Sequence, residues 1–214
     1  VAALTFEFGL KLIYKPRDLR IEAQWFVLLE WLNAHLDAPH YSVRILIRDG
    51  YGWVERVEPA ECADADAARR YYRRAGSLLA LLHALSGTDC HYQNLVAHGE
   101  YPVLVDLETL LHPPTQLWAN QPASDQTRGI ERLLSSVLTT GFLPAWFQDD
   151  GGCVFDASAL GATEAATTGY ETWTCEHANT DRMRVALSPG HTSPGTNIAR
   201  CRGHALCPRD YLEE

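Results

Sequence analysis

The sequence predicts an α+β fold of partial bilobal form, in which strands and one helix over residues 1–60 precede a larger, mainly helical region over residues 61–214. Two observations favour this class. Short alternating apolar segments and a helix come first, and a longer apolar stripe at helical spacing follows them. Elements grouped in this way are typical of α+β proteins. The 214 residues are enough for one large domain or two small lobes.

The first region begins with two short strands within residues 4–15, where apolar and polar residues mostly alternate on either side of Gly9. Pro16 ends the second strand. Asp18 is expected to cap a helix that reaches about Leu36, because apolar residues recur at helical spacing after it. A hairpin over residues 43–57 then turns at Asp49-Gly50, a dipeptide that favours tight turns.

The second region begins with a long helix over about residues 64–85, which Gly87 is expected to end. A loop leads from it to a buried strand over residues 102–107. Residues 112–127 are proline-rich without periodicity and predict a loop, and a helix follows over about residues 128–140. Residues 144–214 have weak periodicity and frequent Gly, Pro, Ser and Thr, so they predict irregular chain with short elements.

The composition excludes some classes of function. The formal net charge of −9 argues against a nonspecific nucleic-acid surface. The sequence has no run of about 18 apolar residues, so it predicts no membrane span, and it lacks the basic start of a signal peptide. We expect a cytoplasmic protein without a nucleic-acid partner, whose six cysteines are free thiols. Because no methionine begins the chain, we expect an internal fragment of a longer protein.

The strongest functional signal is the segment over residues 87–113, GTDCHYQNLVAHGEYPVLVDLETLLHP. Asp89 follows the end of the long helix, where its carboxylate can orient or accept the proton of a Ser or Thr hydroxyl that attacks a phosphate. His91 can share this role or neutralise charge on the transferred group. We interpret Asp89 and His91 as candidate catalytic residues.

Three further residues of this segment are candidate metal ligands. Asn94 offers an amide oxygen, and Asp106 ends the apolar run Val103–Val105 with a carboxylate. Glu108 lies two residues later, on the same side if the strand direction continues. Oxygen donors of this kind hold Mg²⁺ on nucleotide phosphates. The spacing is similar to the catalytic and metal-binding loops of lipid-kinase-like enzymes, and it predicts phosphoryl transfer with ATP and Mg²⁺.

The two lysines are the second signal. Only Lys11 and Lys15 are lysines among 18 basic residues, and both lie in one predicted strand. A strand lysine can bind the α- and β-phosphates of a nucleotide, and we favour Lys15 over Lys11 for this role. Glu22, in the first turn of the next helix, is the candidate partner of Lys15. The sequence contains no simple glycine-rich phosphate-binding motif.

The sequence of these segments resembles that of the dehydratase domain of type II, LanM-type, lanthipeptide (lantibiotic) synthetases. That domain has a lipid-kinase-like fold. The segments GLKLIYKPR, YGWVERVEPAEC, YYRRAGSLLALLHALSGTD, SSVLTTGFLP and ANTDRMR also carry the resemblance. It implies ATP- and Mg²⁺-dependent phosphorylation of Ser and Thr in a ribosomally made precursor peptide with a leader and a Ser/Thr/Cys-rich core. Elimination of the phosphate then completes the dehydration. A C-terminal zinc cyclase domain of the parent chain, absent here, is also implied.

The resemblance also implies roles for particular residues. Lys15 and the acidic and polar residues of the main motif match the phosphorylation residues, although Gln93 stands where the family pattern has Glu. The stretch NTDRMR matches the elimination residues. There Arg184 is the leading candidate for holding the departing phosphate, with Asp181 and Thr180 as further candidates.

Other interpretations stay open at this point. A kinase-like phosphotransferase could act on a lipid, a small molecule or a protein without elimination, and Arg184 would then have only a structural role. A peptide-binding remnant without catalysis is the third hypothesis. The spacing of Cys201, His204 and Cys207, with Cys175 and His177 upstream, raises a structural zinc site as a rival use of these residues.

Overall fold

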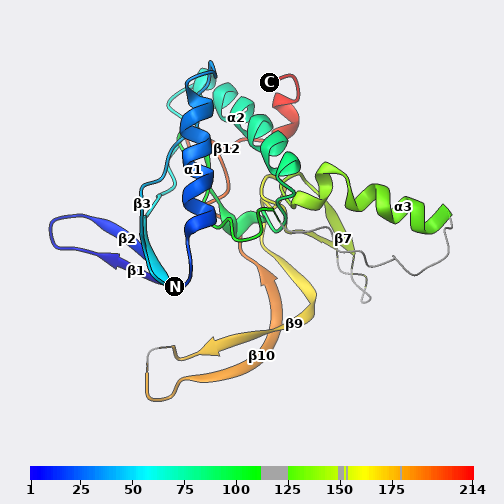
Figure 1. The fold of residues 1–214 in the computed structure, drawn as a ribbon. Coiled ribbons are helices and arrows are strands. Elements are labelled where there is room, and N and C mark those ends of the chain that lie inside the picture. Colours follow the sequence, from blue (N-terminus) through cyan, green and yellow to red (C-terminus); the bar gives the residue numbers. More distant parts are fainter. Residues whose placement is uncertain (112–124, 149–151, 153, 179) are drawn as a thin grey trace.

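The computed structural model describes residues 1–111, 125–148, 152, 154–178 and 180–214. These form a mixed α+β structure of several small antiparallel sheets and three α-helices (Figure 1). The α-helices of the described residues are α1 (Arg20–Asn33), α2 (Ala65–Ala84) and α3 (Asp125–Leu134). Short 3₁₀ turns lie at Tyr92–Asn94, Val137–Thr140 and Pro208–Tyr211.

The largest sheet comes from the start of the chain and has the order β1-β2-β4-β3, with every pair antiparallel. Its strands are β1 (Ala2–Thr5), β2 (Lys11–Lys15), β3 (Ile45–Arg48) and β4 (Tyr51–Glu55). Lys15 at the end of β2 pairs with Gly52 of β4. A Cβ atom at Gly52 would lie 2.5 Å from Leu19 Cδ1, so glycine here lets the buried Leu19 pack at the start of α1. The predicted strands and hairpin of this region are therefore present.

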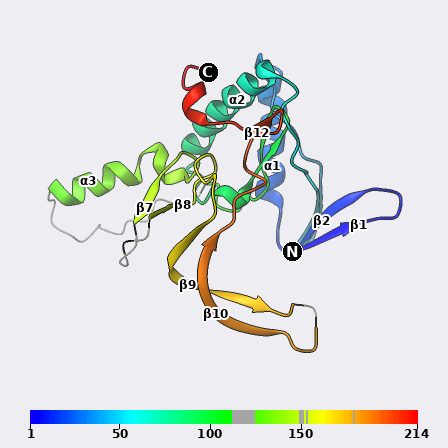
Figure 2. The same cartoon turned by 180° about the vertical axis from the view of Figure 1, so that it is seen from behind.

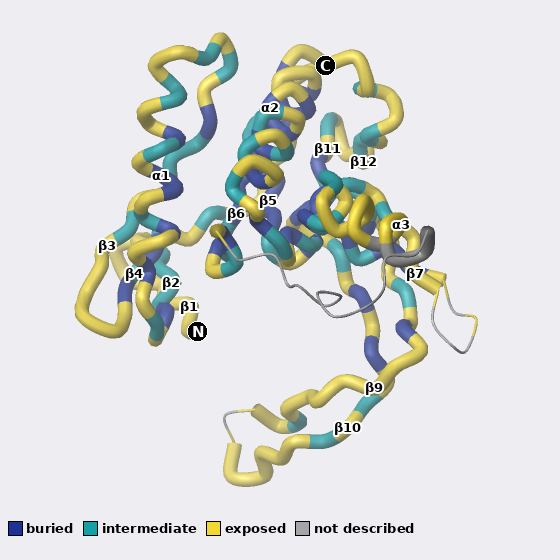
Figure 3. Tube along the Cα trace, turned by 45° about the vertical axis from the view of Figure 1, so that its right-hand side comes forward, coloured by how far each residue is buried: buried dark blue, intermediate teal, exposed yellow. Residues whose placement is uncertain are grey.

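The core joins this sheet to the rest of the molecule. One hydrophobic cluster contains Trp25 and Leu29 of α1 together with Leu78 and Leu82 of α2 and Leu104 of the following hairpin. In Figure 3 the buried positions gather on α1, α2 and the hairpin of β5 (Leu95–His98) and β6 (Tyr101–Leu104). The long hairpin of β9 (Ala166–Glu176) and β10 (Arg184–Thr192) is mostly exposed. The division of the chain into residues 1–60 and 61–214 stays a prediction.

Local hydrogen bonds fix both ends of α2, and its C-terminal end sets where the loop with Asp89 begins. The Asp64 side chain accepts a hydrogen bond from the backbone N–H of Ala67 at 2.7 Å, which caps the first turn. At the other end Ser86 has φ of 51°, and the N–H of Gly87 donates to Leu82 O at 2.8 Å. This is a Schellman ending in which Ser86, and not the expected Gly87, takes the left-handed position.

Four two-stranded antiparallel ladders complete the described part of the chain. The β5–β6 hairpin follows the motif loop, and the long β9–β10 hairpin projects away from the other elements in both Figure 1 and Figure 2. The pairs are β5 (Leu95–His98) with β6 (Tyr101–Leu104), β7 (Trp146–Gln148) with β8 (Val154–Asp156), β9 (Ala166–Glu176) with β10 (Arg184–Thr192), and β11 (Arg200–Cys201) with β12 (His204–Ala205).

The expectation of a mainly helical region over residues 61–214 is wrong, and with it the lipid-kinase-like bilobal architecture. Beyond α2 and α3, the described residues of this region are organised by small antiparallel sheets. β9 and β10 were predicted as irregular because Gly, Pro, Ser and Thr are frequent after residue 144, and the alternation of polar and apolar residues over 172–176 is short. The loop predicted over residues 112–127 lies mostly outside the described residues. No helix of the described residues is long and apolar enough to cross a membrane.

Stability at acid pH is predicted to depend on His40. Burial, together with the nearby Arg74 charge, lowers the pKa of His40 to about 4, whereas an unfolded histidine titrates near pH 6.5. The unfolded chain therefore binds more protons between these values, and the free energy of unfolding should fall by roughly 1–3 kcal/mol as the pH drops from 6.5 to 4. Urea unfolding of the protein and of His40→Gln across this range should give a weaker pH dependence for the variant. Equal slopes would contradict the prediction.

Candidate functional site

A buried ion pair lies at the centre of the candidate site. Lys15 Nζ is 2.8 Å from Glu22 Oε1, and the two side chains are 6% and 3% exposed. Lys15 also donates a hydrogen bond of 2.7 Å to Val105 O and lies 3.4 Å from Asp106 Oδ1. The ammonium group therefore joins the end of β2, the first turn of α1 and the residues that follow β6. Because a buried charge is costly unless it is paired, this contact fixes how the three segments meet.

Arg17 is a site residue that the sequence analysis missed. Its guanidinium forms ion pairs with Glu22 at 2.8 Å, with Glu108 at 3.3 Å and with Asp106. Arg17 follows Lys15 by two residues across Pro16, and the quoted segment GLKLIYKPR contained it. The signal that could have found it is this spacing, because residues two apart in an extended chain point to the same side.

The charges of this cluster are close to balanced. Two cations, Lys15 and Arg17, contact three carboxylates, Glu22, Asp106 and Glu108. The buried Oε2 atom of Glu22 has no hydrogen-bond partner among the described residues. A buried carboxylate oxygen without a donor is unusual in a folded protein. The cluster therefore contains one buried acceptor atom that its own cations leave unsatisfied.

The motif loop, residues 89–94, places the candidate site residues Asp89, His91 and Asn94 around one short turn. Asp89 adopts φ of 60°, and its Oδ1 lies 3.6 Å from His91 Nε2. The backbone N–H of Gln93 donates to His91 Nδ1 at 3.2 Å, so Nε2 carries the proton of the neutral ring. Asn94 Nδ2 donates to Asp89 O at 2.9 Å, which closes the loop. Both Asp89 and His91 are partly exposed, as groups that meet a substrate must be.

The β5–β6 hairpin links this loop to the ion-pair cluster. Val105 N donates to Asn94 O at 3.0 Å, and Asp106 is the next residue. The structure therefore brings the Asn94 backbone beside the residues that follow β6, among which is Asp106.

The donors present here fit Mg²⁺, because the metal binds through one or two carboxylates and keeps several waters and substrate phosphates. Asp106 supplies such a carboxylate, and the hydrogen bond of the Asn94 NH₂ group to Asp89 leaves the amide oxygen as a second donor. No group of three or more His, Cys, Asp or Glu side chains that could hold a metal forms among the described residues. A dedicated cage built from protein side chains is thus not formed there.

A cavity of about 1000 Å³ opens on the other side of the motif loop. Asp89 and His91 line it together with side chains of the β7–β8 and β9–β10 ladders. Much of its wall is aromatic, formed by Tyr92, Phe147, Phe155, Tyr170 and Trp173. The candidate proton acceptors therefore face a cavity with apolar walls, which suits an organic substrate.

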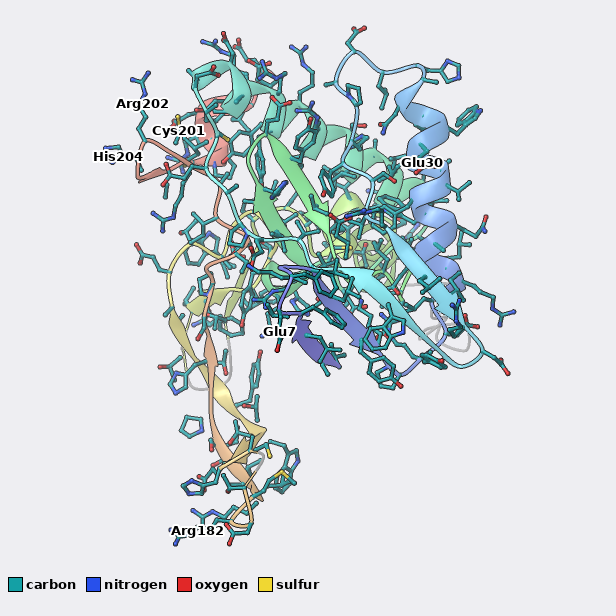
Figure 4. The ribbon with its side chains drawn as sticks, turned by 90° about the vertical axis from the view of Figure 1, so that its left-hand side faces the viewer. Glu7, Glu30, Arg182, Cys201, Arg202 and His204 are labelled. Carbon is teal, nitrogen blue, oxygen red and sulfur yellow. The ribbon has the colours of Figure 1, made fainter. Side chains whose placement is uncertain are left out.

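The predicted elimination residues lie elsewhere. Arg184 pairs with Glu176 across the β9–β10 ladder and is 70% exposed. Thr180 Oγ1 donates a hydrogen bond to His177 O in the turn between the strands. Asp181 is the next residue. Figure 4 shows the neighbouring Arg182 at the far tip of this hairpin. The described residues that line the cavity include none of the three predicted elimination residues, Arg184, Thr180 and Asp181. Their role in elimination stays a prediction.

The cysteines show neither a zinc site nor disulfides in the described part of the chain. Cys201 and His204 lie on the small β11–β12 turn (Figure 4), and no cluster of metal-binding side chains forms there among the described residues. The five described cysteines are free, as predicted, and Cys153 lies outside the described residues. Burial raises the pKa of the Cys90 thiol to about 12, so this neighbour of Asp89 is not a nucleophile near neutral pH.

Two comparisons with known proteins bear on this site. A family model described as "Domain of unknown function (DUF4135)" matches residues 1–214. The "Lacticin 481/lactococcin biosynthesis protein LcnDR2" of Lactococcus lactis subsp. lactis is 32% identical over 145 residues. The matched segment is 63% of this chain and 15% of that protein. This chain therefore corresponds to a small part of its longer relative.

The buried ion pair between Lys15 and Glu22 is predicted to be essential for the stability of the fold. Glu22→Ala would leave Lys15 buried without its nearest carboxylate, so it should lower the free energy of unfolding by about 3 kcal/mol or more. Glu30 is the matched control, because it lies on the same helix with its side chain exposed (Figure 4). Glu30→Ala should cost less than about 1 kcal/mol. Chemical denaturation measures both, and equal losses would show that the buried pair contributes nothing special.

Proposed function

The chain belongs along its whole length to the DUF4135 family, and from this premise we propose that it acts in lantibiotic biosynthesis as a peptide dehydratase. It would phosphorylate Ser and Thr residues of a ribosomally made precursor peptide with ATP and Mg²⁺, and then eliminate the phosphate. Similarity to the lacticin 481/lactococcin biosynthesis protein supports the biosynthetic role. The chemistry rests on the site itself.

The observation that carries the proposal is the Lys15–Glu22 pair beside Asp106. Lysine fixed by a carboxylate, next to a strand-ending aspartate, supplies the groups that phosphoryl transfer needs. In this proposal Lys15 contacts the nucleotide phosphates and Glu22 holds its ammonium in place. Lys11 does not share this position, because it pairs with Glu58 at 2.7 Å.

The protein's own groups then have separate tasks. Asp89 accepts the proton of the attacking Ser or Thr hydroxyl, and His91 supports it with its proton-bearing nitrogen. Asn94 and Asp106 would hold Mg²⁺, with Glu108 as an outer ligand. The ion, when bound, offsets negative charge on the phosphates. The aromatic cavity would receive the peptide side of the reaction.

A phosphotransferase that stops at the phosphorylated product is the second candidate. The position of Arg184, Asp181 and Thr180 outside the lining of the cavity favours it. The two functions differ in the mass of the product, because dehydration leaves the peptide lighter and phosphorylation alone leaves it heavier. Mass spectrometry of Ser/Thr-containing peptides incubated with the intact protein, ATP and Mg²⁺ therefore tests the proposal. Unchanged peptide mass would overturn both candidates.

The two lysines are predicted to differ in nucleotide use. Lys15→Ala should weaken binding of a fluorescent ATP analogue in the presence of Mg²⁺ and slow phosphorylation on the order of 10²-fold or more. Lys11→Ala should retain nearly full activity, because its exposed ion pair lies outside the cluster. Thermal unfolding of both variants controls for misfolding. Equal losses in the two variants, or a larger loss for Lys11→Ala, would reject Lys15 as the phosphate-binding lysine.

Arg184→Ala is predicted to separate the two half-reactions. Elimination is helped by a cation that stabilises the departing phosphate, whereas transfer relies on the Lys15 cluster and Asp89. The variant should therefore accumulate phosphopeptide, which mass spectrometry detects directly. If dehydrated peptide forms at the rate of the unaltered protein, Arg184 has no part in elimination.

A further inference from the structure

The cavity beside Asp89 and His91 contains a second histidine that the proposed phosphorylation does not use. His191 lies near the end of β10, is exposed and lines the cavity. Besides Asp89 and His91, the titratable groups of the described lining are Tyr92 and Tyr170. No Lys or Arg is among these lining residues. His191 is therefore a nitrogen base that lines the same cavity as Asp89, the predicted acceptor of the hydroxyl proton, but it comes from a different element.

The local backbone holds His191 at this place. The β9–β10 register shifts between Pro189 and His191, because three residues of β9 (168–170) lie opposite the single residue Gly190 of β10. A Cβ atom at Gly190 would lie 2.1 Å from Thr168 Oγ1, so the tight packing of this irregularity requires glycine. Such bulges bend a strand and redirect its side chains. Here the residues of the bulge, Thr168 to Tyr170 and Gly190, all line the cavity.

Hydrogen bonds around the bulge fix the position of His191. His191 Nδ1 lies 3.3 Å from Thr167 Oγ1 across the ladder. The next residue, Thr192, is buried, and its Oγ1 accepts a hydrogen bond of 2.9 Å from Ala166 N. Ser193 N donates to Tyr92 Oη at 3.3 Å, which ties the end of β10 to the loop that carries His91. Arg184, in contrast, lies at the other end of the same strand.

The geometry points to His191 as the proton acceptor of the elimination step. This inference rests on the proposed function. A phosphorylated Ser or Thr in the cavity would lose its Cα proton to His191 Nε2, in the tautomer whose Nδ1–H donates to Thr167 Oγ1. The C–H electron pair forms the Cα=Cβ double bond, the Cβ–O bond breaks, and phosphate leaves with that bond's electron pair. Asp89 and His91 then serve the transfer step, and His191 serves the elimination.

A synthetic phosphoserine peptide tests this role without the need for ATP-dependent transfer. The intact protein should convert it to the dehydroalanine peptide and free phosphate, measured by mass and by phosphate release. His191→Gln should slow this conversion by about 10²-fold or more, while phosphorylation of the unmodified peptide stays within about twofold. His35→Gln is the control, because His35 is exposed just after α1. It should leave both rates unchanged.

Two further readouts separate a base from a structural residue. The acid limb of the pH–rate profile for elimination should disappear in His191→Gln, and added imidazole should restore activity to His191→Ala. Elimination at the parent rate in both variants would overturn the inference alone. An equal loss of phosphorylation and elimination, without rescue by imidazole, would also overturn it. If the parent phosphorylates peptides but never releases phosphate from the phosphopeptide, both the elimination half of the proposed function and the role of His191 fail.

Discussion

The buried contact between Lys15, Glu22 and Val105 O is the constraint on which the rest of the structure depends. Its three partners come from β2, α1 and the residues after β6. None of these segments can satisfy the ammonium alone, so the charge is tolerated only when all three are docked. The hydrophobic cluster of α1, α2 and the β5–β6 hairpin supplies that docking. The core and the site are therefore built from the same elements.

Arg17 changes how the acidic groups of this site can behave. Its guanidinium contacts Glu22, Asp106 and Glu108 at once. A cation bound at Asp106 must therefore share that carboxylate with Arg17 or displace it. Because the Arg17 side chain is about a quarter exposed, moving it costs less than moving the buried Lys15. The cluster thus combines one fixed cation with one that is able to adjust.

The sequence predicted the elements whose signals are local. The Asp49-Gly50 hairpin follows from turn chemistry, and the pairing of Lys15 with Glu22 follows from their place on adjacent elements. The expected cap of α1 at Asp18 is wrong, because Leu19 is the N-cap residue and no side chain caps this helix. The β9–β10 hairpin was missed because Gly, Pro, Ser and Thr are frequent after residue 144, and the alternation of polar and apolar residues over 172–176 is short. His191 was missed with it, because only the bulge at Gly190 brings that residue to the cavity. Local periodicity in the sequence does not predict which side chains from distant segments line the same cavity.

The short loop from Asp89 to Asn94 connects two different environments. Asn94 lies against the strand end that carries Asp106, where charges predominate, whereas Asp89 and His91 line the aromatic cavity. The hydrogen bond from Asn94 Nδ2 to Asp89 O holds both ends of the loop in one turn. In the proposed function, this six-residue loop would therefore join the groups that bind the nucleotide to the groups that meet the peptide.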